Sequence, residues 1–258
     1  MMPYLFMGLG AISLGLFLFK RDKKSSVIAI SLKALTSMFF ILTAVFSLLN
    51  SVYLDEDLNY FKLLALLLLV IGLIFGMVGD IFLDFKIYFK ALNMRFLCFE
   101  NDYDILMIAG MSAFGIGHIF YIVSIYIFSP NLVIHLVISM AIALILISLI
   151  FVISIKVMKM DFRKFLIPCY IYGFLLCTFI IFSIFRIIIS YSLFNLLLLI
   201  GSAMFLFSDL VLSITYFSKK EDYEKEGIFN PESKLMIVLN HITYYAAQFL
   251  IAISILFI

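Results

Sequence analysis

The chain has 258 residues, of which 66% are hydrophobic and only 13% are charged, and its formal net charge at pH 7 is +2. Soluble domains are about half apolar and about a quarter charged, so this composition excludes an ordinary soluble domain and indicates an integral membrane protein. A net charge this small gives no reason to expect a nucleic-acid partner.

Apolar runs define the predicted elements. A helix needs about 20 mainly apolar residues to cross the hydrocarbon core of a bilayer. Runs of this kind predict a single all-α domain over residues 1–258 with eight transmembrane helices, at positions 3–19, 27–49, 61–83, 104–128, 131–155, 165–185, 191–217 and 235–257.

The basic residues indicate how these helices are oriented. Most of the 18 Lys and Arg residues fall in the connections after the first, third, fifth and seventh predicted helices. Positive charge in short loops stays on the cytoplasmic side of a membrane. We therefore expect these four connections in the cytoplasm and both termini on the non-cytoplasmic side of a multi-pass membrane protein.

Charges within the predicted helices are few. Lys33 lies in the second helix, Asp80 in the third and Asp209 in the seventh. Asp84 follows the predicted end of the third helix, where we interpret it as a solvated helix end. A charge that faces lipid costs several kcal/mol, so the three interior charges should face the inside of the bundle or a water-filled cavity.

Other polar side chains are expected near these charges. With the predicted topology and a rise of about 1.5 Å per residue, His118 of the fourth helix lies at a similar depth, in the cytoplasmic half. So do Tyr244, Tyr245 and Gln248 of the eighth helix. Polar groups from five helices that converge in an apolar bundle are the default expectation for a binding or reaction site.

Each residue also has a purely structural interpretation. Lys33 could neutralise one aspartate as a structural ion pair. His118 could be a helix-packing residue, and Tyr121, Tyr172 and the tyrosines of the eighth helix could be packing aromatics with hydrogen-bonded hydroxyls. Two carboxylates against one ammonium nevertheless leave one negative charge over.

Four short motifs occur in order from the third to the eighth predicted helix. They are GDIFL at 79–83, GMSAFGIGHIFY at 110–121, IGSAMFLFSD at 200–209 and TYYAAQ at 243–248. Together with Lys33 in the second helix, this series resembles the lysoplasmalogenase family of YhhN-like membrane proteins.

The resemblance implies an enzyme that hydrolyses the vinyl ether bond of a lysophospholipid, lysoplasmenylethanolamine or lysoplasmenylcholine. The products would be a fatty aldehyde and a glycerophospho-base. Asp80 and Asp209 fall on the aspartates that are the family's catalytic candidates, and Lys33 falls on its lysine. The motifs add further residues with a supporting or substrate-binding role: His118, Tyr121, Ser208, Tyr244, Tyr245 and Gln248.

The chemistry of a vinyl ether fits two aspartates. Acid protonates the carbon beta to the oxygen, and water captures the resulting oxocarbenium ion. Such an enzyme needs a proton donor and a carboxylate that stabilises the cation, as in glycoside hydrolysis. Either aspartate suits the role of acid, and Lys33 would hold the nearer one ionised. Lys33 or Lys219 could also meet the phosphate of the lipid.

Two other functions remain open. Buried charges also mark ion pathways, so a transporter or a proton-coupled membrane protein is the main alternative. A zinc-dependent lipid amidase would need three protein ligands, and His135 is expected near the outer face, far from His118 and His241, so we expect no metal and no cofactor. A weak repeat of 1–128 and 131–258 is also suggested, because GDIFL and HIFY in the first half correspond to SDLVL and HITY in the second.

Overall fold

The structure is a computed structural model that describes residues 1–21, 27–54, 59–91, 100–128, 133–224, 227 and 230–258. This part of the chain is helical and contains no strand, which confirms the all-α class. Its α-helices are α1 (Met2–Lys20), α2 (Val27–Leu54), α3 (Tyr60–Ala91), α4 (Glu100–Ile127), α5 (Val133–Val152), α6 (Leu166–Ile189), α7 (Leu193–Phe217), α8 (Lys220–Glu224) and α9 (Lys234–Ser254).

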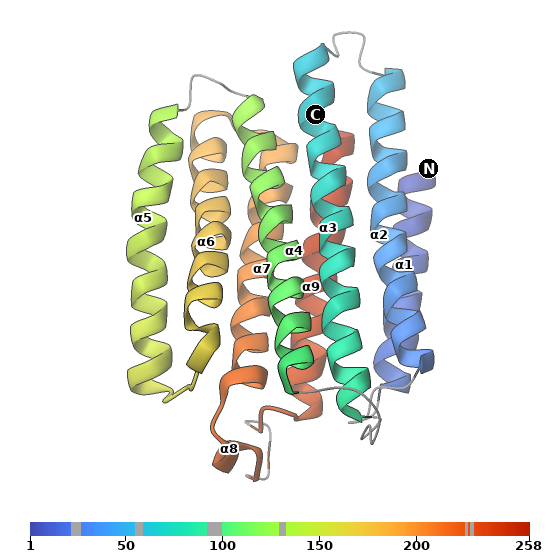
Figure 1. The fold of residues 1–258 in the computed structure, drawn as a ribbon. Helices are drawn as coiled ribbons and strands as arrows, with labels where there is room; N and C mark the ends of the chain where they lie inside the picture. Colours follow the sequence, from blue (N-terminus) through green and yellow to red (C-terminus); the bar gives the residue numbers. More distant parts are fainter. Residues whose placement is uncertain (22–26, 55–58, 92–99, 129–132, 225–226, 228–229) are drawn as a thin grey trace.

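Eight helices of the described chain are long and apolar enough to cross a membrane, as the sequence predicts. They are α1 to α7 and α9. The short α8 lies at one end of the bundle, and both termini lie toward the other end (Figure 1). The assignment of these ends to the two sides of a membrane stays a prediction.

The ends of several helices differ from the predicted ends. Helix α3 continues to Ala91, well past the predicted end at residue 83, so Asp84 lies within the helix. Helix α5 ends in a π-helical turn, Ile153–Val157, and a 3₁₀ turn, Arg163–Phe165, precedes α6. Hydropathy does not detect the added turns of α3 because charged residues appear in them while the backbone stays helical.

Side chains at the helix starts satisfy backbone groups that the helices leave free. The Ser192 hydroxyl accepts a hydrogen bond from the Asn195 backbone N–H at the start of α7. Ser233 caps α9 in the same way through Met236. Pro168 lies in the first turn of α6, where its missing N–H costs little. These local signals explain where the helices begin.

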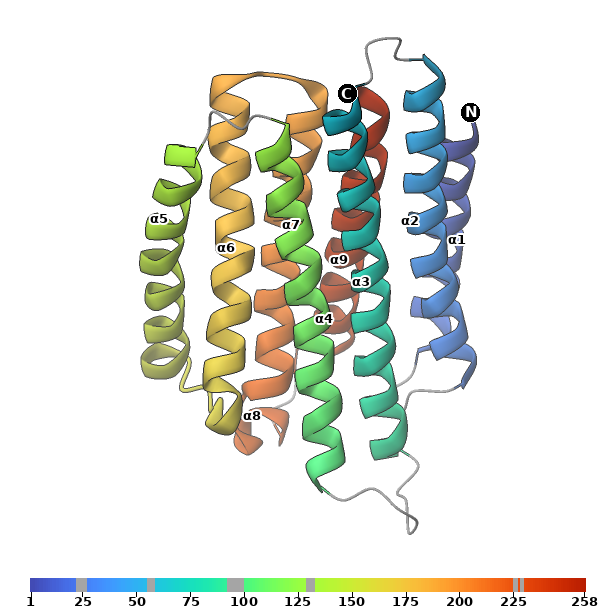
Figure 2. The same cartoon turned by 45° about the horizontal axis from the view of Figure 1, so that its top comes forward.

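Helix α9 lies inside the bundle and contacts α1, α2, α3 and α7. Neighbouring helices pack in pairs, α1 with α2, α3 with α4, α5 with α6 and α7 with α9. Helices α1 and α5 lie at opposite outer edges of the bundle (Figure 2). Polar side chains on α9 are therefore placed within reach of several other helices.

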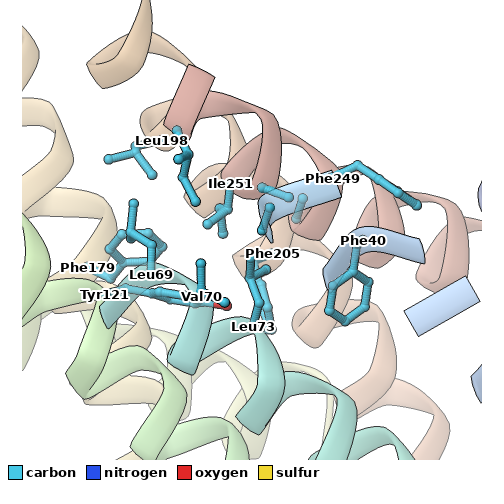
Figure 3. Close-up of a cluster of buried hydrophobic side chains, with 14 of the residues drawn as sticks. Phe40, Leu69, Val70, Leu73, Tyr121, Phe179, Leu198, Phe205, Phe249 and Ile251 are labelled. Atoms are coloured by element: carbon cyan, nitrogen blue, oxygen red, sulfur yellow. The ribbon is translucent and has the colours of Figure 1, made fainter. Parts of the chain in front are cut away.

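One hydrophobic cluster joins most of the helices. Its side chains come from α2, α3, α4, α6, α7 and α9 and include Phe40, Leu73, Tyr121, Phe179, Phe205 and Ile251 (Figure 3). Close backbone contact between α3 and α4 depends on glycine, because a Cβ on Gly117 would lie 2.9 Å from the Gly72 carbonyl oxygen. Small residues at such contacts let helices pack tightly where lipid removes the usual hydrophobic driving force.

Candidate active site

A buried group of charges connects α2 with α3. The Lys33 Nζ lies 2.9 Å from Asp84 Oδ1 and 3.3 Å from Asp80 Oδ1. The two aspartates are four residues apart, so they lie on the same face of α3. The three residues are only 5 to 6% exposed. Lys33 thus forms ion pairs with two carboxylates in the interior of the bundle.

The interpretation of Asp84 as a solvated helix end is wrong. Asp84 is 5% exposed and forms the shorter of the two ion pairs with Lys33. The physical reason is the continuation of α3, which keeps Asp84 on the face that already carries Asp80. The site therefore contains three aspartates, and Asp80 and Asp84 both form an ion pair with Lys33.

Asp80 has neutral partners as well. Its Oδ2 accepts hydrogen bonds from the Ser37 hydroxyl at 2.9 Å and from the Tyr244 hydroxyl at 2.8 Å. Ser37 lies one helical turn after Lys33, so α2 presents both side chains to the same carboxylate. A carboxylate that accepts two hydrogen bonds beside an ammonium is stabilised in its charged form.

A chain of hydrogen bonds positions Tyr244. Gln248 Nε2 donates to the Tyr244 hydroxyl at 3.1 Å, and the Tyr121 hydroxyl donates to Gln248 Oε1 at 3.2 Å. Gly76 makes room for this contact, because a Cβ there would lie 2.6 Å from Gln248 Nε2. The Tyr245 hydroxyl instead donates to the Lys33 backbone carbonyl at 3.1 Å. Tyr121 and Gln248 thus reach Asp80 only through Tyr244, whereas Tyr245 contacts the Lys33 backbone directly.

The second predicted aspartate has a simpler environment. The Tyr172 hydroxyl of α6 donates a hydrogen bond to Asp209 Oδ2. Within the described residues, no basic side chain forms an ion pair with Asp209. Asp209 is also less buried than Asp80. One phenol hydroxyl is therefore its only side-chain partner in this part of the chain.

Both predicted catalytic residues face one cavity, which we call the charged cavity. Its empty volume is about 620 Å³, part of which is its open mouth. The lining includes five ionisable side chains, Arg21, Lys33, Asp80, Asp84 and Asp209. The structure thus brings Asp80 and Asp209, which lie on α3 and α7, to the same enclosed space.

A second cavity, the apolar pocket, adjoins the charged cavity. Its walls come mainly from α4, α5, α6 and α7, and include Met107, Ile147, Phe151, Leu176, Leu206 and Phe217. Asp209 and Tyr172 line both cavities. Asp209 therefore lies where a charged compartment meets an apolar one.

His118 and Ser208 have structural contacts. The His118 ring packs against Phe205, with the ring centroids 4.7 Å apart, and its Nδ1 donates to the Phe114 carbonyl oxygen at 2.8 Å. His118 does not line either cavity. Ser208 does line the charged cavity, and its hydroxyl donates to the Asn240 carbonyl oxygen at 3.1 Å. Ser208 therefore joins α7 to α9 beside Asp209.

Several residues of the charged cavity are not among the predicted site residues. Ser37 could have been found from its spacing of one turn from Lys33, and Asn240 lies just before the TYYAAQ motif. Arg21 has no such signal, because it follows the predicted first helix, where basic residues indicate topology. In the structure Arg21 Nη1 lies 2.7 Å from His241 Nε2.

The histidines occupy separate helices, His118 on α4, His135 on α5 and His241 on α9. Among the described residues, no group of three His, Cys, Asp or Glu side chains has the arrangement of a metal site. Metal independence stays a prediction that an activity measurement has to test.

Comparison with known proteins identifies the family. The model of the YhhN family matches residues 28–255, a range that holds Lys33, Asp80 and Asp209 and leaves Arg21 outside. The sequence has no significant match among curated proteins or among solved structures. The chain belongs to the YhhN family.

Proposed function

We propose that this YhhN-family chain is a multi-pass membrane hydrolase that cleaves the vinyl ether bond of lysoplasmalogens. The observation that carries the proposal is the position of Asp209 between the apolar pocket and the charged cavity. A lysoplasmalogen has the same division, with one hydrocarbon chain, a vinyl ether and then a glycerophospho-base. With its chain in the apolar pocket and its headgroup in the charged cavity, the vinyl ether would lie beside Asp209.

The environments of the two aspartates support different roles. Asp80 is held as a carboxylate by Lys33 and two hydroxyl donors. Asp209 borders the apolar pocket with no basic partner among the described residues, and an unpaired charge in such a place is costly. We therefore assign the transferable proton to Asp209.

In this mechanism Asp209 protonates the carbon beta to the ether oxygen. The double bond supplies the electron pair for the new C–H bond, and the positive charge develops on the carbon attached to oxygen. The fixed charge of Asp80 in the same cavity stabilises this oxocarbenium ion electrostatically. Tyr172, bonded to Asp209, stabilises the carboxylate that the transfer leaves behind.

Water completes the reaction. A water molecule adds to the cationic carbon and gives one proton to the Asp209 carboxylate, which restores the acid. The resulting hemiacetal breaks its bond to the glycerol oxygen, and the products are a fatty aldehyde and a glycerophospho-base. One water is consumed and no other reactant is needed.

The test is aldehyde release by the purified chain from lysoplasmenylethanolamine or lysoplasmenylcholine, with the saturated alkyl ether analogue as the control. We expect release from the vinyl ether only, because the alkyl ether has no double bond to protonate. Release that a chelator abolishes and zinc restores would show that the two-aspartate mechanism is wrong.

A transporter is the alternative outcome of the same preparation. Proteoliposomes that carry protons or ions but release no aldehyde from either lysoplasmalogen would favour transport through the charged cavity. The mouth of that cavity is expected on the cytoplasmic side, with both termini opposite. Labelling of a terminal cysteine only from the cytoplasm would contradict that orientation.

A further inference from the structure

Arg21 brings a second cation into the charged cavity. It follows α1 as the C-terminal cap and lines the cavity together with Lys33. Its guanidinium carbon lies 5.4 Å from the centroid of the Phe17 ring, a cation–π distance. Its Nη1 lies 2.7 Å from His241 Nε2. Two side chains from α1 and α9 therefore hold the guanidinium in place.

The hydrogen bonds of His241 define which nitrogen carries the proton. His241 Nδ1 lies 2.7 Å from the Ile237 carbonyl oxygen, which can only accept, so Nδ1 is the donor. His241 Nε2 is then free to accept from Arg21, since a guanidinium has no acceptor. The ring in this arrangement is neutral, so it orients Arg21 without cancelling its charge.

Arg21 and Lys33 differ in their negative partners. Lys33 lies within 3.3 Å of the carboxylates of both Asp80 and Asp84. Among the described residues no carboxylate forms an ion pair with Arg21. An anion at Lys33 would meet two carboxylates in contact with the lysine, whereas an anion at Arg21 would meet a guanidinium that forms no ion pair with a carboxylate of the described residues. Arg21 is thus the better anion site in the cavity.

We propose that Arg21, oriented by His241, binds the phosphate of the lysolipid headgroup and makes the protein selective for phosphate-bearing ether lipids over neutral ether glycerols. A guanidinium offers a planar pair of donors that matches phosphate oxygens. Because Arg21 and Asp209 line the same cavity, phosphate bound at Arg21 positions the lipid relative to the acid. The choice of lysolipid as ligand rests on the proposed function, but the anion site does not.

The test measures binding apart from hydrolysis. The purified full chain in detergent is titrated with radiolabelled 1-alkyl-lysophosphatidylethanolamine and, separately, with 1-alkylglycerol of the same chain length. Neither ligand has a vinyl ether, so neither is a substrate. Arg21→Gln should weaken binding of the phospholipid about tenfold or more and leave binding of the alkylglycerol unchanged.

Lys20→Gln is the matched control, because Lys20 is the neighbouring residue, carries the same charge and is exposed. It should change neither affinity. Arg21→Lys keeps the charge without the planar fork, so it should weaken phospholipid binding by less than Arg21→Gln. It also provides a folded comparison if Arg21→Gln does not purify as a single species.

Three outcomes would overturn the proposal. Arg21→Gln could lower the affinity for both ligands by the same factor, or Lys20→Gln could lower the affinity for the phospholipid as much as Arg21→Gln does. The unaltered chain could also fail to bind the phospholipid. If Arg21→Lys alone can be purified, phospholipid affinity equal to that of the unaltered chain would also overturn it. If Arg21→Gln lowers only the affinity for the phospholipid, and the unaltered chain releases no aldehyde, the phosphate site stands and the proposed reaction is wrong.

Discussion

Asp80 and Asp209 share one cavity but have very different surroundings. Asp80 is almost fully buried, lies 3.3 Å from Lys33 Nζ and accepts two further hydrogen bonds. Asp209 is less buried, has the Tyr172 hydroxyl as its partner and also borders the apolar pocket. In the proposed mechanism this difference keeps Asp80 as the anion and leaves Asp209 able to exchange a proton.

The difference explains why a lysine belongs in the site. Two equivalent carboxylates facing one cavity would share protons and have no fixed roles. Lys33 pairs with Asp80 and Asp84, so it favours the ionised form of the carboxylates on α3. In the proposed mechanism Asp209 on α7 is then the acid. A structural ion pair and a catalytic role for Asp80 are therefore compatible.

The largest effect on turnover is expected from a change at Asp209. Asp209→Asn should lower aldehyde release about 100- to 10,000-fold, because an amide cannot protonate carbon. The melting temperature of the purified protein should stay close to that of the unaltered chain, since the amide oxygen of the new side chain can still accept from Tyr172. Retained turnover in a folded protein would remove Asp209 from the mechanism.

Asp80→Asn should abolish turnover to a similar extent for a different reason, the loss of the charge that stabilises the oxocarbenium ion. The double variant with Asp209→Asn should be no slower than either single one, because residues that act as a unit are not additive. If instead Asp80→Asn with Lys33→Met regained turnover, Asp80 would be only a partner of the lysine.

The third prediction concerns the stability that Lys33 gives to the carboxylates of α3. Lys33→Met removes the ammonium from two buried carboxylates and should destabilise the protein by about 3 to 5 kcal/mol. Adding Asp84→Asn should recover part of this loss, because Asp84 forms the closer ion pair. Unfolding in a denaturing detergent measures both values. An unchanged unfolding curve for Lys33→Met would mean that the carboxylates take up protons without cost.

A smaller effect is expected from the partner of Asp209. Tyr172→Phe removes the single hydroxyl bonded to that carboxylate and should lower kcat about tenfold, with little change in stability. Tyr170→Phe is a suitable control, since Tyr170 lies on the same helix and bonds to Ser148 instead. Equal losses of kcat in the two variants would indicate a general effect of altering α6.

The smallest effect is predicted for Ser208. Ser208→Ala removes the hydrogen bond that the hydroxyl donates to the Asn240 carbonyl oxygen and the longer one, at 3.4 Å, that it accepts from Asn240 Nδ2, and should cost about 1 kcal/mol of stability. The Asn240 side chain still donates to the Ser208 backbone carbonyl at 2.9 Å, so α7 and α9 stay joined. Turnover should change less than about threefold, because Ser208 is not bonded to either aspartate. A loss as large as that of Tyr172→Phe would indicate contact with the substrate.

Family motifs and charge patterns are sufficient to identify much of the site. They select Lys33, Asp80 and Asp209, and they include Tyr244 and Gln248, which the structure connects to Asp80. They cannot separate packing from chemistry, and His118 shows this, since it lies in a family motif yet packs among aromatic rings. A motif reports that a residue type recurs, and its contacts depend on how its helix is rotated.

The sequence by itself predicted the all-α class and eight helices long and apolar enough to cross a membrane, because hydropathy and helix length are properties read along the chain. Only the tertiary structure decided that Asp84 pairs with Lys33, that Tyr172 reaches Asp209 and that Arg21 meets His241. The partners in each pair lie on different parts of the bundle, and Arg21 and His241 are 220 residues apart in sequence. Which faces meet is fixed by lateral packing, which the order of residues along one helix does not specify.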